Sequence, residues 1–452
     1  MKNISIWNEY HNKKEYPKLM KDIETDILII GGGITGINTF HTLKEKNLNV
    51  VLVERNKICN SVTSRSTGKL SFLQNNLIDK IRENCGDKKA SLYLKSQIDA
   101  INGVVNTINK YKIDCDLEKV DSICYTNDIN EINKLKDFRK FLNKNNINTY
   151  ECNNNLIRNK YMFKVKDTYI FNPVKYCYNL ISKYNKDIYE NTCIKRIEKA
   201  NNYYNCYTDN NVIKTKWVIL ACHYPYFIIP YLFPLKSSLE KSYISASKYK
   251  GNKLSLISYD NPFVSIRTYK DYLIYLSNTH YINESVCDRE NFNELIKKVN
   301  DINLKPEYLW SNIDIITSDG MPYIGILKEK VLISTGYNTW GLSTSFLASS
   351  ILKNIILKKK NKYIKLFSPK RKTINKGIIN NAFKSIQGLI KGYTYINNKE
   401  EDNINKICPH MGCKLIYNEI EETWDCPCHG SKFNKNGKVI DSPANKDITK
   451  KK

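Results

Sequence analysis

A glycine-rich turn near the N-terminus constrains the fold of this chain more than any other feature. Gly31, Gly33 and Gly36 stand in the order G-x-G-x-x-G, after an apolar run at 25–30 and before a helical pattern at 37–46. A second apolar run follows at 49–54. This strand–turn–helix–strand order is typical of a dinucleotide-binding unit. The sequence therefore predicts an α/β fold with a parallel sheet.

The chemistry of dinucleotide binding explains why the three glycines and the acidic residue stand at these positions. Gly31 allows the tight turn, Gly33 lets the backbone approach a pyrophosphate, and Gly36 lets helix and strand pack closely. The helix N-terminus supplies N–H groups and a positive dipole to the phosphates. Glu54, at the end of the second run, can accept hydrogen bonds from ribose hydroxyls and would repel a 2′-phosphate. A glycine turn without a ligand is the alternative.

A second motif lies near the C-terminus. Cys408 and His410 give C-x-H, and Cys426 and His429 give C-x-x-H fifteen residues later. Two thiolates on one iron and two imidazoles on the other fit a [2Fe–2S] cluster, whose potential rises because imidazole is neutral. Two Cys and two His also suit zinc. Zinc, however, would leave Cys413 and Cys428 unexplained.

Composition excludes several function classes. The net charge is +26, but lysine is spread along the whole chain and no nucleic-acid-binding motif appears, so we expect no nucleic-acid partner. No apolar run reaches the length of a membrane span, and residues 1–21 contain no signal-peptide core. Ten cysteines scattered between Cys59 and Cys287 indicate reduced thiols and a cytoplasmic location.

The larger part of the chain resembles the FAD-dependent amine-oxidising family related to D-amino-acid oxidase, glycine oxidase and sarcosine oxidase. The resemblance spans about 7–357 and rests on GGGITG, on Glu54–Arg55, on SVTSRSTGK at 61–69, on TSDGMPYIG at 317–325 and on STGYNTWGL at 334–342. It implies FAD as the cofactor. The contacts that it implies are Ser64, Thr67, Gly68 and Lys69 beside the isoalloxazine ring, Ile194 at the adenine, Ala221 at the far side of the dinucleotide, and Arg55, Asp319, Gly336, Gly341 and Leu342. A helix that begins near Leu342 would direct its positive end at the flavin and stabilise the reduced ring.

The loops CPHMGC and CPCHGS resemble Rieske proteins, especially those of cytochrome bc complexes. The resemblance implies that Cys408 and Cys426 bind the buried iron, that His410 and His429 bind the exposed iron, and that Cys413 and Cys428 form a disulfide. Ser431 is present, but Phe433 replaces a tyrosine that hydrogen-bonds the cluster in high-potential relatives. We therefore expect a potential below the top of the ~−150 to +300 mV Rieske range. The supporting sheet is abbreviated, so either the cluster is less stable than in relatives or the flavin domain provides part of the support.

These features predict a Rossmann-type FAD-binding domain with an inserted α+β substrate domain, followed by a small all-β Rieske domain. The predicted parts are 24–77, 168–235 and 311–357 for FAD, 78–167 and 236–310 for substrate, a basic linker and helix at 358–391, and the Rieske domain at 392–452. Residues 168–173 and 193–197 are predicted to be strands. The linker helix is expected from an apolar stripe of Ile379, Phe383, Ile386 and Ile390.

The predicted function is oxidation of a small substrate, an amine or amino acid, by hydride transfer to FAD. The electrons then pass singly through the cluster to an acceptor protein or quinone. The alternative is an electron-transfer or redox-sensing protein without a substrate of its own. No second G-x-G-x-x-G for a nicotinamide cofactor is found. The catalytic base stays unassigned among His223, His280, Tyr224, Tyr269 and Tyr323.

Overall fold

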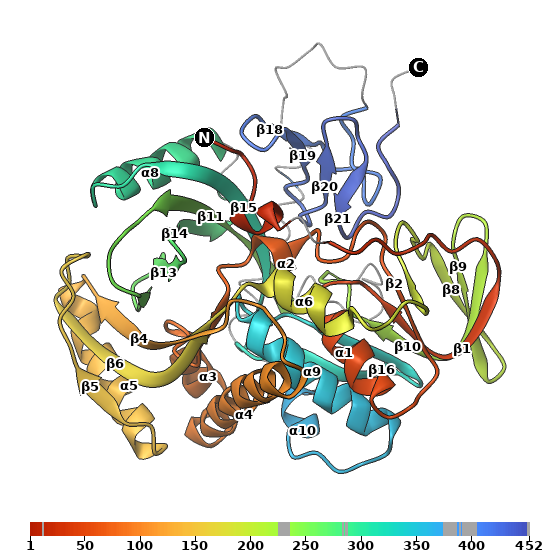
Figure 1. The fold of residues 1–452 in the computed structure, drawn as a ribbon, viewed down its shortest axis with the longest axis horizontal. Coiled ribbons are helices and arrows are strands. Elements are labelled where there is room, and N and C mark those ends of the chain that lie inside the picture. Colours follow the sequence, from red (N-terminus) through yellow and green to blue (C-terminus); the bar gives the residue numbers. More distant parts are fainter. Residues whose placement is uncertain are drawn as a thin grey trace.

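The structure, a computed structural model, describes residues 1–10, 13–224, 236–282, 284, 288–373, 387, 390 and 405–449. In these ranges the chain forms three β-sheets of eight, nine and four strands. Figure 1 shows the four-stranded sheet in blue, beside strands β11 and β15 of the nine-stranded sheet. No helix in the described ranges has both the length and the apolar character that a membrane crossing requires.

The eight-stranded sheet contains the predicted dinucleotide unit. Its main path runs β16–β17–β10–β1–β2–β7, and β9 pairs with both β10 and β8. β1 is parallel to β2 and β10, and β10 is parallel to β17. The strands are β1 (Ile23–Ile30), β2 (Val50–Val53), β7 (Ile188–Tyr189), β8 (Arg196–Ala200), β9 (Tyr203–Tyr207), β10 (Val212–Leu220), β16 (Tyr323–Lys328) and β17 (Val331–Thr335). The predicted α/β fold class is confirmed.

β1 is apolar without interruption over its last four residues because both faces of the sheet are covered. Ile27 and Ile29 belong to one hydrophobic core, whereas Leu28 and Ile30 belong to a second core. Helices pack against one another over the first core, and α1 contacts both α6 and α9. These helices are α1 (Ile34–Lys44), α6 (Pro173–Ile181) and α9 (Gly341–Ile356).

The nine-stranded sheet runs β15–β11–β14–β13–β12–β4–β6–β3, with β5 paired to β6. Its pairs are antiparallel except for β12 and β4. Its strands are β3 (Lys69–Leu70), β4 (Glu118–Thr126), β5 (Thr149–Glu151), β6 (Tyr161–Ile170), β11 (Ser237–Lys248), β12 (Ser255–Ser258), β13 (Ser265–Tyr269), β14 (Tyr272–Tyr281) and β15 (Pro306–Thr317). The accompanying helices are α3 (Leu77–Cys85), α4 (Asp87–Tyr111), α5 (Ile132–Lys144) and α8 (Asp288–Asn300), and the short elements are η1 (Ile6–Glu9), α2 (Val62–Arg65), η2 (Ile129–Glu131) and α10 (Ile364–Phe367).

The four-stranded sheet organises residues 405–449, here called the C-terminal module. Its antiparallel strands are β18 (Ile416–Asn418), β19 (Thr423–Asp425), β20 (Lys432–Asn434) and β21 (Val439–Asp441). Its own core is small and centres on Leu415, Trp424 and Phe433. The module also packs on the nine-stranded sheet, since the Gly430 backbone faces Leu239 and Ile313.

Three boundaries differ from the predictions. The strand expected at 168–173 ends at Ile170 in the nine-stranded sheet, because Asn172 caps α6 through two backbone N–H groups and Pro173 begins that helix. The strand expected at 193–197 begins only at Arg196. Residues 311–317, placed with the FAD-binding part, belong to β15, which pairs with β11 of the nine-stranded sheet instead. Most of the predicted linker stripe, and residues 392–404, lie outside the described residues.

Candidate functional site

In the glycine turn between β1 and α1, neighbouring backbone atoms leave no room for a side chain at two of the glycines. Gly31 adopts a φ of +115°, and a Cβ there would lie 2.6 Å from the Ala221 carbonyl oxygen. A Cβ on Gly36 would lie 1.9 Å from the Gly31 oxygen. A Cβ on Gly33, the N-cap residue of α1, would meet the Thr63 hydroxyl at 3.3 Å. Gly31 and Gly36 are therefore required by the turn itself, whereas Gly33 leaves space for an approaching ligand.

Glu54 follows β2 and binds the turn directly. Its Oε2 accepts a hydrogen bond from the Gly32 backbone N–H at 2.7 Å, and its Oε1 accepts one from Asn56 at 2.8 Å. Burial raises the pKa of Glu54, while these two N–H groups lower it. A carboxylate has about four acceptor positions, so Glu54 can hold the turn and still accept a ligand hydroxyl.

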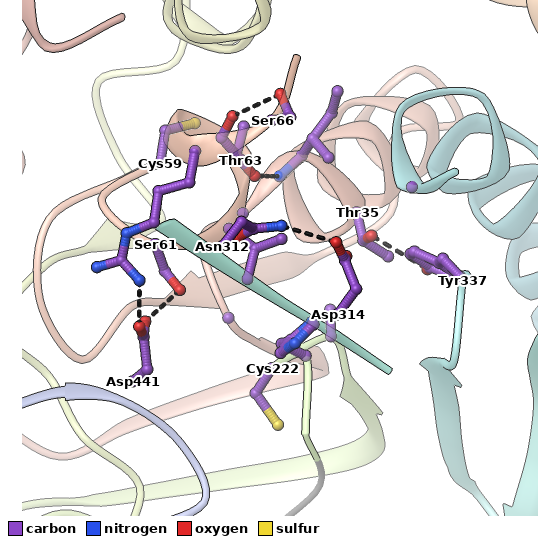
Figure 2. A pocket seen from close by; sticks show the side chains of 18 of the residues that line it. Thr35, Cys59, Ser61, Thr63, Ser66, Cys222, Asn312, Asp314, Tyr337 and Asp441 are labelled. Atoms are coloured by element: carbon purple, nitrogen blue, oxygen red, sulfur yellow. Dashed lines mark hydrogen bonds and ion pairs between the residues drawn. The ribbon is translucent and has the colours of Figure 1, made fainter. Parts of the chain in front are cut away.

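A large cavity opens beside the turn, with about 1780 Å³ of empty space that is partly open to solvent (Figure 2). Its lining comes from both large sheets and from the C-terminal module. Most of the predicted cofactor contacts meet there, namely Gly31, Gly33, Glu54, Arg55, Thr67, Lys69, Ile194, Ala221, Gly336, Gly341 and Leu342. Residues far apart in the sequence thus converge on one space.

Four predicted contacts do not line this cavity, namely Gly36, Ser64, Gly68 and Asp319. Asp319 is the main correction. Its two carboxylate oxygens accept hydrogen bonds from Arg371 at 2.7 and 2.9 Å, and the carboxylate is almost fully buried. Such a bidentate pair satisfies both groups, so Asp319 stabilises the fold and needs no cofactor.

The loop between β17 and α9 lies within the segment 334–342, on which the resemblance to FAD-dependent enzymes partly rests. Gly336 adopts a φ of +72°, as the tight loop requires. The Tyr337 hydroxyl is hydrogen-bonded to Ser334 at 2.6 Å and to Thr35 at 3.1 Å, which ties this loop to the glycine turn. α9 begins at Gly341 on the cavity wall. Its positive end therefore favours negative charge inside the cavity.

Of the five candidates for a catalytic base, His223 lines the cavity. Its Nε2 is buried without a hydrogen-bond partner in the described part of the chain, and burial lowers its pKa to about 4. The others lie elsewhere: His280 is bonded to the Tyr243 hydroxyl, Tyr269 donates to Asp116, Tyr323 stacks on Arg371, and Tyr224 packs on His429.

Two loops of the C-terminal module bring the predicted cluster ligands together. Cys408 and Cys426 are buried free thiols. The His410 and His429 rings lie 5.2 Å apart between centroids, and the Nδ1 atom of each is buried without a partner among the described residues. Cysteine thiolates and unbonded imidazole nitrogens are the donors that a Rieske cluster needs. The donor set therefore fits a [2Fe–2S] cluster.

The surroundings favour the ligating form of Cys408 and of His429, whereas the hydrogen bond with Cys408 and burial raise the pKa of the Cys426 thiol. The Cys426 thiol, together with backbone N–H groups of His410 and Met411, lowers the pKa of Cys408 to about 7, although burial opposes the shift. Burial lowers the pKa of His429 to about 4, which keeps its imidazole neutral. A disulfide between Cys413 and Cys428 joins the two loops.

The C-terminal module also forms part of the cavity wall. Residues 440–442 belong to the lining. Asp441 forms an ion pair with Arg65, and Arg55 Nη1 donates to the Ala444 carbonyl oxygen at 2.5 Å. Sequence reasoning missed this wall because Arg65 and Asp441 are 376 positions apart and no local pattern links them.

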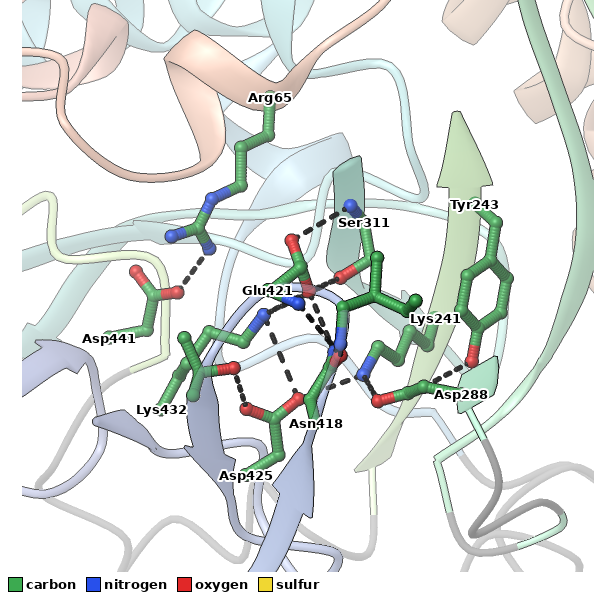
Figure 3. Close-up of polar contacts among 12 residues, drawn as sticks. Arg65, Lys241, Tyr243, Asp288, Ser311, Asn418, Glu421, Asp425, Lys432 and Asp441 are labelled. Atoms are coloured by element: carbon green, nitrogen blue, oxygen red, sulfur yellow. Dashed lines mark hydrogen bonds and ion pairs between the residues drawn. The ribbon is translucent and has the colours of Figure 1, made fainter. Parts of the chain in front are cut away.

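A buried ionic network holds the module on the nine-stranded sheet (Figure 3). Lys241 of β11 contacts Asp288 of α8 at 2.7 Å and Asp425 of β19 at 2.8 Å. The Lys241 side chain is 7% exposed, and both carboxylates are at most 15% exposed. One buried lysine thus joins the module to the nine-stranded sheet and to α8.

A second part of the network centres on Glu421. It contacts Lys432 at 2.6 Å and accepts a hydrogen bond from the Ser311 backbone N–H at 3.0 Å. Burial raises the pKa of Glu421, but Lys432, Lys241 and Arg65 together lower it to about 2. Glu421 therefore stays ionised at the interface. The expected support of the short module by the main body is visible in these contacts.

Comparison with known proteins identifies a family for the large N-terminal part of the chain and another for its C-terminal module. The family model described as FAD dependent oxidoreductase matches residues 26–354. The chain belongs to this FAD-dependent oxidoreductase family. The model of the Rieske [2Fe–2S] domain matches residues 394–451. The cofactors are therefore FAD and a [2Fe–2S] cluster, as predicted, and the zinc alternative is set aside.

Relatives and solved structures agree with this assignment. The putative Rieske 2Fe-2S iron-sulfur protein YhfW of Bacillus subtilis is 28% identical, over 98% of this chain and 96% of the relative. A cytochrome b6-f complex iron-sulfur subunit of Microcystis aeruginosa is 43% identical over 63 residues, which is 13% of this chain and 35% of that protein. The fold is similar to L-amino acid deaminase from Proteus vulgaris, with a TM-score of 0.64, 16% identity, and coverage of 80% of this chain and 99% of that chain. Glycine oxidase from Geobacillus kaustophilus also gives a TM-score of 0.64, with 15% identity and coverage of 78% and 100%.

Replacing Phe433 with tyrosine should raise the midpoint potential of the cluster. Phe433 is fully buried in the module core, two residues from Ser431, whose hydroxyl contacts the Cys408 thiol. A tyrosine hydroxyl that bonds a cluster sulfur stabilises the reduced form, and a tenfold change in that equilibrium corresponds to about 59 mV for one electron. Redox titration followed by EPR measures the shift.

The opposite change provides the control for this prediction. Ser431→Ala removes a hydroxyl that now bonds Cys408, so it should lower the potential. Equal potentials in the wild type and the Phe433→Tyr variant, with the EPR signal intact, would contradict the assignment of this position.

Proposed function

We propose that the protein oxidises an amine or amino acid and delivers the electrons, one at a time, to an acceptor protein or quinone. Bound FAD accepts a hydride, and a Rieske cluster carries single electrons. Each substrate molecule supplies two electrons, so two one-electron transfers complete a turnover. The names of the structural neighbours, which include L-proline dehydrogenase from P. horikoshii, support oxidation of a C–N bond.

The residues proposed to hold the two cofactors are those that the structure gathers. Gly31, Gly33 and Glu54 bind the dinucleotide end of FAD, and the start of α9 faces the flavin. Cys408 and Cys426 bind one iron, and His410 and His429 bind the other. A cytoplasmic location is supported by nine further cysteines in the described ranges, all of them free thiols.

One observation carries the proposal: the cavity and the cluster ligands are separated by a single residue. His223 lines the cavity. The next residue, Tyr224, lies with its ring centroid 6.3 Å from that of His429. Tyr224 is buried and packs with Leu239. The two proposed cofactor sites are thus connected through packed side chains of one chain, which supports direct electron transfer between them.

The proposal predicts that one substrate reduces both cofactors without oxygen. The purified protein, loaded with FAD and cluster, is mixed anaerobically with amines, N-methyl amino acids and hydroxy acids. We expect an amine or amino acid to bleach the flavin absorbance, after which the EPR signal of a reduced Rieske cluster appears. In a Cys408→Ser variant the flavin should still bleach and the EPR signal should be absent.

Two results would reject the proposal. Reduction by NADH, with no response to the panel, would favour the electron-transfer alternative. A flavin that bleaches while the intact cluster stays oxidised would show that the two sites are not coupled.

A further inference from the structure

One part of the cavity wall is polar and is formed by the paired strands β11 and β15. Asn312 and Asp314 of β15 line the cavity (Figure 2). Ser242 of β11 lines it as well. In this antiparallel pair Ser242 stands opposite Asn312, and Glu240 stands opposite Asp314. Cross-strand partners project from the same face of a sheet. We call the three lining residues, Ser242, Asn312 and Asp314, the β11–β15 polar patch.

The patch is rich in hydrogen-bond acceptors. Asn312 is 5% exposed, and its Oδ1 is buried with no hydrogen-bond partner among the described residues. Its Nδ2 donates to Asp314 Oδ2 at 2.8 Å. Burial and the like charge of Glu240 raise the pKa of Asp314 to about 7, although the bond from Asn312 opposes the shift. Because a buried acceptor without a donor is costly, the patch suits a ligand that brings N–H donors.

The basic residues of the cavity are already bonded within the protein. Lys57 pairs with Glu190, Arg65 pairs with Asp441, and Arg55 and Lys69 donate to the carbonyl oxygens of Ala444 and Leu256. In the described lining, therefore, each lysine and arginine has a protein acceptor. Asn312 Oδ1 and the Asp314 carboxylate contrast with this, since they have acceptor capacity left for a positively charged ligand.

We propose that the β11–β15 polar patch binds the nitrogen of a cationic amine substrate, with Asp314 and Asn312 as acceptors and without a need for a substrate carboxylate. This inference rests on the proposed function and narrows its substrate class. In the bound state one ammonium N–H bond breaks and an O–H bond forms on Asp314. No electrons are exchanged in this step. It leaves a neutral amine, and its lone pair would permit the neighbouring carbon to give a hydride to bound FAD, so that the amine is oxidised to an iminium ion and the flavin is reduced.

Matched probes test the patch in the FAD-loaded protein. n-Butylamine and butyrate have similar size and opposite charge, and their binding is followed by perturbation of the flavin spectrum. We expect the wild type to bind butylamine more tightly than butyrate. Asp314→Asn should weaken butylamine binding by about tenfold or more, since it removes the charged acceptor, and should leave butyrate binding and FAD content unchanged.

A control variant lies in the same domain. Asp271 is an exposed carboxylate that pairs with Lys248, and Asp271→Asn should keep wild-type affinity for butylamine. Loss of FAD from Asp314→Asn would assign the carboxylate to the flavin site and overturn the inference. Wild-type preference for butyrate would overturn it without any variant.

Failure of this inference can be told apart from failure of the proposed function. If an amine reduces the wild-type flavin and Asp314→Asn keeps full affinity for butylamine, the function stands and the patch is wrong. If only hydroxy acids reduce the flavin while Asp314→Asn loses butylamine binding, the patch stands as a cation site and amine oxidation is wrong.

Discussion

Replacing Lys241 with methionine is expected to lower the free energy of unfolding by about 3–5 kcal/mol, because two buried carboxylates lose their shared cation. Lys241 holds Asp288 at 2.7 Å and Asp425 at 2.8 Å. Asp425 belongs to the C-terminal module and Asp288 to α8, which packs on the nine-stranded sheet, so the loss falls on the interface between them. The second lysine near Asp425, Lys432, is 3.7 Å away and compensates only in part.

Urea unfolding measures this effect with two signals, flavin fluorescence and the visible circular dichroism of the cluster. Both should shift to lower urea, because the module also forms a wall of the flavin cavity through Asp441 and Arg65. The matched control is Lys435→Met on the same module. Lys435 and Glu422 form a pair that is 62% and 60% exposed, and such pairs contribute at most about 1 kcal/mol. Equal midpoints for the two variants would mean that the network does not hold the module.

The parts of the fold that local pattern decides were predicted from the sequence. The apolar run before Gly31 forms β1, and the glycine spacing places α1 directly after it. The two cysteine–histidine motifs form the loops that bring the cluster ligands together. In each of these units the interacting residues are close in sequence, so their spacing alone restricts the structure.

The parts that distant pairing decides were not predicted. β15 has the composition of a strand, but its partner β11, which decides its sheet, begins about 70 residues earlier. Asp319 stands inside a motif that suggested flavin contact, yet Arg371, 52 positions later, takes both of its oxygens. The acidic part of the cavity wall was not predicted for the same reason. From the sequence alone, Asp314 looks like an ordinary polar position in a strand in which polar and apolar residues alternate.

Alanine at Gly36 and alanine at Gly33 are expected to have different effects. The first should reduce folding stability, and the second should reduce FAD binding. In Gly36→Ala the new Cβ would lie 1.9 Å from the Gly31 carbonyl oxygen, inside the packed contact of β1 and α1. Backbone atoms cannot move aside as a flexible side chain does, so we expect a loss of more than about 3 kcal/mol in stability. The variant should accumulate poorly and melt well below the wild type in circular dichroism.

In Gly33→Ala the new Cβ would stand 3.3 Å from the Thr63 hydroxyl, a contact that a small side-chain shift relieves. The apoprotein should therefore melt within a few degrees of the wild-type apoprotein. Gly33 lines the cavity at the start of α1, where a methyl group keeps a pyrophosphate away from the backbone N–H groups. Flavin titration should show FAD affinity reduced by about tenfold or more. Gly36 is thus assigned to packing and Gly33 to ligand binding. A Gly33→Ala variant that unfolds, or that binds FAD normally, would refute the assignment of Gly33.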